Sequence, residues 1–173
     1  MIRKAVMDDI GAIVNTYEEL LAYEQINGSN SNWRLGVYPT IKVPQEKVPA
    51  GEMFVLEHDG NICGSMVLNN DQAVEYQDMN WKYTIQADEV LVIHTLCIPP
   101  EMSRCGYAKE MLQFAKDYAK KKQCRVIRLD TYAHNEPAKR LYVKNGFEII
   151  GYGPILLNGL IKEEQVYLEC RIN

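Results

Sequence analysis

Apolar residues in the first third of the chain recur with the spacing of a strand, a helix and a hairpin. Residues 2–6 form a short apolar run that predicts a strand. Asp8 follows as a candidate helix cap, and the next apolar residues recur at intervals of three and four, which predicts an amphipathic helix. Two apolar runs then flank Asp59-Gly60, a dipeptide that favours a tight hairpin turn. The helical apolar positions are Ile10, Ile13, Val14, Tyr17 and Leu21.

The second half of the chain alternates strand and helix patterns. Residues 90–98 are apolar almost throughout, which is typical of a strand buried on both faces, and residues 125–131 predict another strand. A helix with an apolar stripe lies between them. A second, shorter helix has Asn135 as its candidate cap and Gly146 beyond its end, and two strands close the chain. This order predicts an α/β (α+β) fold built on a central mixed sheet.

A polar loop, "NGSNSNWRLGVYPT", separates the first helix from the hairpin. A loop of this length is usually either disordered or part of a site. Its aromatic residues, Trp33 and Tyr38, favour the second alternative. Their rings either wall a pocket for a substrate or hold the loop against the core.

Composition narrows the functional classes. With 173 residues, 47% hydrophobic and 24% charged, the chain is expected to form a single domain over residues 1–173. No apolar run approaches the ~18–20 residues of a membrane span, and the first residues lack the features of a signal peptide, so we expect a cytoplasmic protein. A net charge of −4 gives no general electrostatic reason to bind nucleic acid. The five cysteines contain no C-x-x-C pair, which argues against a disulfide framework or a metal site.

The segment "IHTLCIPPEMSRCGYAKEMLQFA" carries the first chemical signal, because a small-residue turn joins the buried strand to the helix. A helix start exposes backbone N–H groups and the positive end of a dipole, so it is a ready site for an anion. Gly106 leaves room for a phosphate, and the side chains of Ser103 and Arg104 are close enough in sequence to add contacts. Taken alone, this turn is better explained by tight packing of helix on strand.

A second motif, N-x-x-A-x-x-L-Y-x-x-x-G-F, follows one helix and one strand later. With the turn Ser103-Arg104-Cys105-Gly106-Tyr107-Ala108 before it, the segment of about residues 90–152 resembles the GCN5-related N-acetyltransferase (GNAT) superfamily. The resemblance implies a central mixed, mostly antiparallel sheet flanked by helices on both faces, with acetyl-CoA as cofactor. Ser103 departs from the family pattern, which usually has Gln or Arg there. The residues of the second motif are Asn135, Ala138, Leu141, Tyr142, Gly146 and Phe147.

The resemblance also assigns roles along the cofactor. Main-chain groups of Leu96 and Ile98, on either side of Cys97, would pair with the pantetheine arm as an added strand. Amides of residues 104–108 would hold the pyrophosphate. A backbone N–H near Leu96 would face the thioester carbonyl. The residues expected at the sulfur end are Asn135, Ala138 and Tyr142.

The implied reaction is direct acetyl transfer to an amine. Tyr142 is the candidate general acid for the thiolate. A phenol near pKa 10 and a thiol near 8.5 make full transfer uphill by roughly 2 kcal/mol, and core packing is the alternative role. His94 is the first candidate base, because alternation places it on the face of Leu96 and Ile98 unless a bulge intervenes; a core histidine is the alternative. Glu89 is the second candidate, and a water chain is the third.

We therefore expect an acetyl-CoA-dependent N-acetyltransferase that acts on a primary amine, either of a small molecule or of a protein N-terminus or lysine. Trp33 and Tyr38 are the expected acceptor-binding residues. The alternative function is a non-catalytic acyl-CoA-binding sensor. We expect no nucleic-acid or membrane partner, and the sequence is compatible with a homodimer. A scattered set of acids either attracts a cationic acceptor or serves as surface: Glu18, Glu19, Asp71, Glu75 and Asp78.

Overall fold

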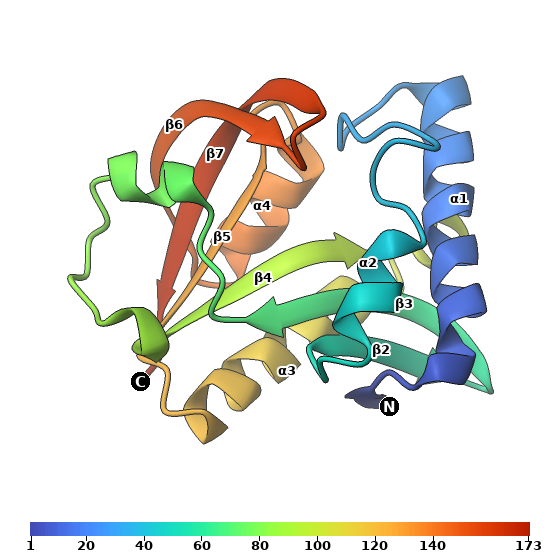
Figure 1. The fold of residues 1–173 in the computed structure, drawn as a ribbon, viewed down its shortest axis with the longest axis horizontal. Coiled ribbons are helices and arrows are strands. Elements are labelled where there is room, and N and C mark those ends of the chain that lie inside the picture. Colours follow the sequence, from blue (N-terminus) through green and yellow to red (C-terminus); the bar gives the residue numbers. More distant parts are fainter. The chain divides into compact units, whose positions relative to one another are not determined.

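The computed structural model describes residues 1–173 and contains seven strands and four α-helices (Figure 1). The chain forms two compact units. The first comprises residues 1–29, 33–68 and 94–114, and the second comprises residues 30–32, 69–93 and 115–173. The single domain over residues 1–173 stays a prediction. The elements in chain order are β1 (Ile2–Lys4), α1 (Ile10–Asn27), α2 (Lys42–Lys47), β2 (Met53–His58), β3 (Asn61–Asn69), β4 (Val90–Cys97), α3 (Tyr107–Lys121), β5 (Val126–Tyr132), α4 (Glu136–Lys144), β6 (Glu148–Leu157) and β7 (Ile161–Arg171).

The first unit is built on the antiparallel strands β1, β2 and β3. Asp59 and Gly60 both adopt positive φ angles (50° and 78°), so the predicted hairpin between β2 and β3 is confirmed. Alternate residues of β2 face opposite sides of the sheet. Met53 belongs to the buried cluster under α1, whereas the ring of Phe54 lies 5.3 Å from that of Phe114 in α3. Helices therefore cover both faces of these strands.

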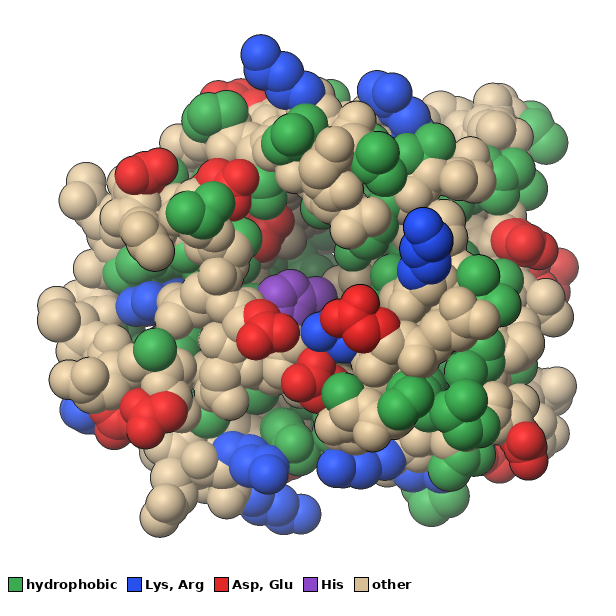
Figure 2. Space-filling model, viewed as in Figure 1, with side chains coloured by type: hydrophobic (Ala, Val, Ile, Leu, Met, Phe, Trp, Pro, Cys, Tyr) green, Lys and Arg blue, Asp and Glu red, His purple; other side chains and the backbone are tan.

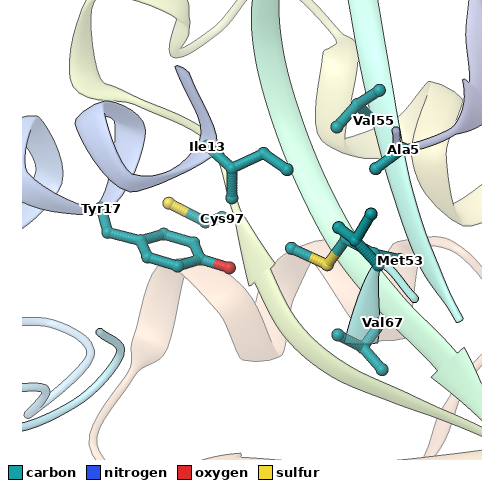
Figure 3. Close-up of a cluster of buried hydrophobic side chains, with 8 residues drawn as sticks. Ala5, Ile13, Tyr17, Met53, Val55, Val67 and Cys97 are labelled. Carbon is teal, nitrogen blue, oxygen red and sulfur yellow. The ribbon is translucent and has the colours of Figure 1, made fainter. Parts of the chain in front are cut away.

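The core beneath α1 confirms the predicted helical face. Ile13 and Tyr17 are buried against the strand residues Met53, Val67 and Cys97 (Figure 3). The Cys97 Sγ points toward α1, where it lies 3.7 Å from the carbonyl oxygen of Thr16, and burial raises the pKa of this thiol to about 12. Cys97 therefore serves the core through its side chain and leaves only its main chain for a ligand.

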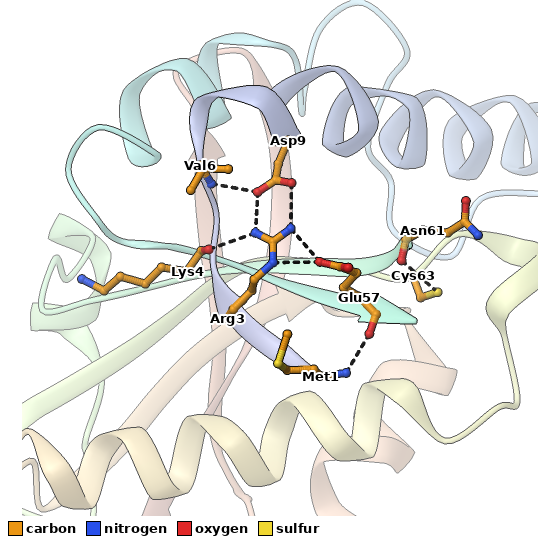
Figure 4. Close-up of polar contacts among 8 residues, drawn as sticks. All are labelled: Met1, Arg3, Lys4, Val6, Asp9, Glu57, Asn61 and Cys63. Carbon is orange, nitrogen blue, oxygen red and sulfur yellow. Dashed lines mark hydrogen bonds and ion pairs between the residues drawn. The ribbon is translucent and has the colours of Figure 1, made fainter. Parts of the chain in front are cut away.

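The start of α1 differs from the prediction. A 3₁₀ turn covers Met7–Asp9, and α1 begins at Ile10 with Asp9, not Asp8, as the residue before it. The Asp9 carboxylate accepts two hydrogen bonds from the Arg3 guanidinium (2.7 and 2.9 Å) and one from the Val6 N–H (2.8 Å), as Figure 4 shows. Arg3 also contacts the Glu57 carboxylate. The partly exposed guanidinium of Arg3 pairs with Asp9 and not with its exposed neighbour Asp8.

The second unit contains the strand order β4-β5-β7-β6. β4 and β5 run parallel but pair over three residues only, Val90–Val92 with residues 126–128. β5 and β7 pair antiparallel from end to end, and β7 pairs antiparallel with β6. Together with the first unit, this confirms the predicted fold class: α/β with a mixed, mostly antiparallel sheet. The β6–β7 hairpin turns at Asn158 and Gly159, which both have positive φ.

Residues 69–89 cover one face of the second unit's strands. Tyr76 and Trp81 pack edge-on against the buried ring of Tyr167. On the same face, the buried Arg128 guanidinium pairs with Glu169 at 2.8 Å. The sequence missed this cluster because its aromatic residues are spaced irregularly between polar ones.

The molecular surface carries both signs of charge. On the face in Figure 2, acidic and basic side chains are interspersed and no continuous basic stripe is visible. Each helix is either too short or too polar to cross a membrane.

Candidate active site

The turn before α3 presents a row of backbone donors. The amides of residues 104–108 donate no hydrogen bond, and the first bonded amide of the helix is that of Glu110, which donates to the Gly106 carbonyl at 3.0 Å. Arg104 and Gly106 both adopt left-handed conformations (φ 64° and 85°), so successive N–H groups curve into a concavity suited to an anion. The turn is exposed. These unpaired donors are suited to an anionic group such as a diphosphate.

Glycine at position 106 has a backbone reason besides the room for a phosphate, which stays a prediction. A Cβ added to Gly106 would meet no atom within 4 Å, so crowding is absent in the protein itself. The left-handed φ of 85°, which side chains disfavour, explains the glycine. The side chain of Arg104 forms no ion pair and is available to the same anion.

Thr95 interrupts β4. Its φ of 48° is left-handed, which is rare for a β-branched residue and marks local strain. Such a residue breaks the strict alternation of an extended strand, as a β-bulge does. Burial nevertheless alternates here, with His94, Leu96 and Ile98 half-buried and Thr95 and Cys97 buried, and the grouping of His94 with Leu96 and Ile98 stays a prediction.

The aromatic loop meets the strand at this interruption. The hydroxyls of Tyr38 and Thr95 share a hydrogen bond, with 2.6 Å between Oη and Oγ1. The Trp33 ring stands edge-on to Tyr38 at 5.8 Å and packs against the core beneath α1. The two rings thus hold the loop to the core, which is one of the two roles expected for them. The other role, binding of the acceptor by Trp33 and Tyr38, stays a prediction.

In the second unit, Asn135 sets the start of α4. Its Oδ1 accepts a hydrogen bond from the Ala138 N–H at 3.2 Å, and its own N–H donates to the Tyr132 carbonyl at 2.8 Å. The cap predicted for Asn135 is confirmed. By fixing the first turn, Asn135 also fixes the side of α4 on which Tyr142 lies.

Tyr142 is buried, with 7% of its surface exposed, and its ring stands edge-on to Phe147 at 5.7 Å. Its hydroxyl takes part in no hydrogen bond. Burial, and secondarily the charge of Asp130, raise the pKa of this phenol well above its ordinary value. Tyr142 is consequently protonated at neutral pH and has a proton to donate.

Asp130 is a further candidate that the sequence analysis missed. This residue of β5 is half-buried, and its Oδ1 accepts the Tyr76 O–H at 2.6 Å. Burial raises its pKa, and perturbed carboxyls of this kind gather at active sites. In the sequence, Asp130 is the one carboxylate within the strand pattern "VIRLDTY". Alternation alone would place its side chain on a solvent-facing side of the strand, so the pattern did not identify it as a site residue.

Glu89 lies at the other end of β5. Its carboxylate faces Arg125 at 4.0 Å, and its carbonyl accepts the Arg125 N–H at 2.8 Å. Asp130 comes five residues after Arg125 along the extended strand, which corresponds to roughly 17 Å. The two carboxylates therefore belong to opposite ends of the second unit's strands.

A pocket of about 410 Å³ opens in the second unit between residues 75–79 and the β6–β7 hairpin. Glu75 and Asp78, two of the acids noted in the sequence, lie on its wall. Met79 and Ile155 supply apolar surface, and Lys162 adds a positive charge. The pocket suits a molecule with both polar and apolar parts.

Comparisons with known proteins agree with this geometry. An uncharacterised N-acetyltransferase of Methanocaldococcus jannaschii is 32% identical over 71 residues, which are 41% of this chain and 31% of that relative, so the match spans about a third of the relative's length. A crystal structure of an acetyltransferase candidate from Staphylococcus aureus Mu50 is 28% identical, covers 100% of this chain and 99% of its own, and has a TM-score of 0.73.

Another solved structure, an acetyltransferase candidate from Salmonella typhimurium with its cofactor acetyl-CoA, shares the fold at 14% identity. It covers 100% of this chain and 94% of its own, with a TM-score of 0.72. The model of the acetyltransferase (GNAT) family matches residues 15–147, more than half of the chain. The family uses acetyl-CoA, for which the exposed amides before α3 are suited. This chain belongs to the GNAT acetyltransferase family.

Proposed function

We propose that this protein transfers an acetyl group from acetyl-CoA directly to a primary amine, either of a small molecule or of a protein N-terminus or lysine. The observation that carries the proposal is the row of unpaired amides at residues 104–108. Donors arranged in this way bind a diphosphate, and the family model supplies the reaction.

The donor is held along the first unit by main-chain groups. Amides of residues 104–108 bind the pyrophosphate, and the side chains of Ser103 and Arg104 add contacts. Leu96 and Ile98, flanking Cys97, offer main-chain groups to the pantetheine arm. When bound, acetyl-CoA supplies a thioester whose acetyl group an amine can accept.

Thr95 orients the backbone amide that faces the thioester carbonyl, where negative charge develops. Its left-handed backbone reorients the following peptide, and the Leu96 N–H then donates to the carbonyl oxygen of the thioester as negative charge grows there. The hydrogen bond between Tyr38 and Thr95 holds this local conformation. An amide fixed before the reaction contributes more to the rate than one that must reorganise.

Tyr142 protonates the leaving sulfur. Its unpaired, protonated hydroxyl supports this role, while Asn135 and Ala138 define the first turn of its helix. The raised pKa means that full transfer to a thiolate is uphill in the free protein. Any change that removes negative charge near Tyr142 therefore helps the transfer.

The amine must lose a proton, and the sequence offers His94, Glu89 or a water chain to take it. The ion pair of Glu89 with Arg125 at the start of β5 weighs against Glu89. His94 lies next to Thr95 and stays a candidate base. Trp33 and Tyr38 are the proposed acceptor-binding residues of the first unit.

The test is a panel of primary amines, including peptides with free N-termini and lysine side chains, with release of free thiol measured in the presence of acetyl-CoA. Turnover with at least one amine is expected. Calorimetry with acetyl-CoA, run in parallel, separates the rival function: binding without thiol release across the panel would identify a non-catalytic sensor.

A further inference from the structure

The pocket of the second unit is formed by two walls that are held firmly in place. One wall is the 3₁₀ turn Val74–Asp78, which lies beside β6 (Figure 1). Within it, Tyr76 donates its O–H to Asp130 of β5 at 2.6 Å, and its carbonyl accepts the Trp81 Nε1–H at 2.7 Å. The other wall is the β6–β7 hairpin. Because both walls are anchored to the sheet, the pocket exists before a ligand arrives.

The floor of the pocket is apolar, because glycines of β6 leave room for a methionine. A Cβ added to Gly153 would lie 3.1 Å from Cε of Met79, and one added to Gly151 would lie 3.6 Å from its Sδ. Met79 therefore packs directly on the strand backbone, and Ile155 continues the apolar surface. A thioether side chain adapts its shape to different aliphatic partners. The floor thus suits a flexible chain of methylene groups.

The walls carry charged groups that have no partner. The carboxylates of Glu75 and Asp78 form no ion pair and accept no hydrogen bond, and the ammonium group of Lys162 has no partner either. The two negative charges act on the interior, where they raise the pKa of the Tyr167 phenol, after burial and the charge of Asp130. Two carboxylates against one ammonium group leave the pocket with a net negative charge, which favours a cation.

Exposed apolar side chains border the pocket on both walls. Val74 precedes Glu75 on the turn, and Leu156 and Leu160 belong to the hairpin. Exposed apolar surface of this kind marks contact with other molecules. A small amine fills only the pocket of about 410 Å³, whereas a peptide can also cover this rim with the residues that flank the one in the pocket. The occupant that uses the whole surface is therefore part of a peptide.

Charge and shape together select the residue that enters. An arginine or lysine side chain has an aliphatic stem that packs on apolar surface and a cationic head that donates hydrogen bonds to carboxylates. We propose that the pocket binds the side chain of an arginine or lysine in a peptide or protein acceptor, at a position other than that of the acetylated amine. The inference rests on the proposed function and narrows its acceptor to peptides and proteins.

This contact should affect binding and not the chemical step, because it involves no reacting atom. It should lower KM and leave kcat unchanged. The test uses peptides with one free amine, N-terminal in one set and a lysine side chain in another, and one arginine moved along the chain. Each is compared with the same peptide carrying citrulline, which has the shape of arginine without its charge. We expect arginine to lower KM by about fivefold to twentyfold at a defined distance from the amine, and by much less elsewhere.

Substitutions in the pocket should change this arginine advantage with opposite signs. Glu75→Gln and Asp78→Asn each remove one negative charge, and each should reduce the advantage by about threefold to fivefold. Lys162→Gln removes the opposing ammonium group and should increase the advantage. In all three variants kcat and the melting temperature should stay near wild type, because none of these side chains has a partner within the protein.

The matched control is Asp88→Asn, which removes the same charge from the far end of the unit. Asp88 is exposed and adjoins Glu89, whose carbonyl accepts the Arg125 N–H. The Arg125 carbonyl in turn accepts the N–H of Ile172, just past the last residue of β7, whereas Lys162 is near the first. The arginine advantage should be unchanged in this control. An equal loss in the control would show that general attraction by an acidic protein is responsible, and would overturn the inference.

A second experiment tests the pocket without turnover. The probe is a short peptide with an acetylated N-terminus, one central arginine and no lysine, so that it contains no amine to acetylate. Isotope-labelled methionine methyl groups report on its position by NMR, and Met79→Leu identifies the signal of Met79 on the pocket floor. The arginine peptide should shift the Met79 methyl signal, and the citrulline peptide should need about fivefold to twentyfold higher concentration for the same shift.

The outcomes separate this inference from the proposed function. If the wild type acetylates amines but shows no preference for arginine at any position, the proposed function stands and the inference is overturned. If the wild type acetylates no amine, the proposed function fails, and the binding experiment decides about the pocket. A Met79 methyl signal that responds to arginine and not to citrulline would then support a site for basic peptides, and an unmoved signal would overturn it.

Discussion

At the residue scale, burial separates the hydroxyl groups by function. Tyr167 keeps an unpaired phenol sealed in the core, whereas the buried hydroxyls of Tyr17 and Ser65 neighbour each other. Leaving a buried hydroxyl unpaired costs about 1–3 kcal/mol, so the Tyr167 phenol is a stability cost that the surrounding packing offsets. Tyr142 also has a hydroxyl without a hydrogen bond, and it belongs to the family motif, so we propose that this hydroxyl acts as the acid.

The first prediction concerns Tyr142→Phe. The ring can keep its edge-on contact with Phe147, so folding and acetyl-CoA affinity should be little changed. Without its proton, kcat should fall by about 10²-fold or more. Steady-state kinetics on an active amine, with calorimetry for acetyl-CoA, measures both. Unchanged turnover would remove Tyr142 from the mechanism, and Tyr83→Phe serves as the matched control.

At the element scale, β3 lies close to the end of β4 and to α3. A Cβ on Gly64 of β3 would lie 2.5 Å from Cδ1 of Ile98, 3.0 Å from Sδ of Met111 and 3.2 Å from the Cys97 carbonyl oxygen. The first two are flexible side-chain ends, but the third is backbone. Glycine at this position lets β3 lie close to the main chain that is proposed to hold pantetheine.

The second prediction is that Gly64→Ala lowers the free energy of unfolding by about 1–3 kcal/mol, because the methyl group must displace Ile98 and the Cys97 backbone. Denaturant unfolding measures the loss. Gly151→Ala in β6 is the matched control, since its Cβ would meet only Met79 Sδ at an ordinary 3.6 Å. Equal effects of the two substitutions would contradict the close-approach argument.

At the scale of the whole molecule, stability should depend on pH through Asp9. The hydrogen bonds from Arg3 are the main cause of the lowered pKa of this carboxyl. A group with a depressed folded-state pKa contributes stability above its unfolded pKa, near 3.9, and loses it as the pH falls through the folded value. The ion pair is partly exposed, with 30% of the Arg3 side chain accessible, so its contribution is screened.

The third prediction follows from the lowered pKa of Asp9. Asp9→Asn should be less stable than wild type by about 1–2 kcal/mol at neutral pH, and the gap should close progressively below about pH 4. Urea unfolding at several pH values tests it. Asp8→Asn, an exposed neighbour without a partner, should match the wild type throughout. A gap that is constant with pH would show that charge is not its origin.

The fourth prediction links acetyl-CoA binding to global stability. At a concentration of about 100 times Kd, a ligand that binds only the folded state stabilises it by about 2.7 kcal/mol, which is roughly 5–10 °C in Tm for a chain of this size. Gly106→Ala should fold normally, because its Cβ meets nothing, but should bind about tenfold or more weakly, because alanine disfavours the left-handed turn. Gly11→Ala, in an ordinary helical conformation with open space, should keep the full thermal shift.

The sequence was most informative where the signal is local. The Asp59-Gly60 turn, the cap at Asn135 and the apolar face of α1 were predicted because turn conformations, capping and helical periodicity involve only residues near one another in the chain. The start of α1 was placed one residue early because Asp8 and Asp9 are equivalent as local caps. The hydrogen bonds that Asp9 accepts from Arg3 and from the Val6 N–H distinguish the two.

What the sequence determined by itself is the family, the fold class and the order of elements, since these follow from periodicity and from two motifs of fixed spacing. Only the tertiary structure decided which backbone residues are left-handed and which polar atoms are paired. The left-handed backbone at Thr95 and the hydrogen-bonded carboxylate of Asp130 depend on partners 57 and 54 residues away, Tyr38 and Tyr76. Strain and perturbed pKa values arise from burial and long-range contacts, which no local pattern of residues encodes.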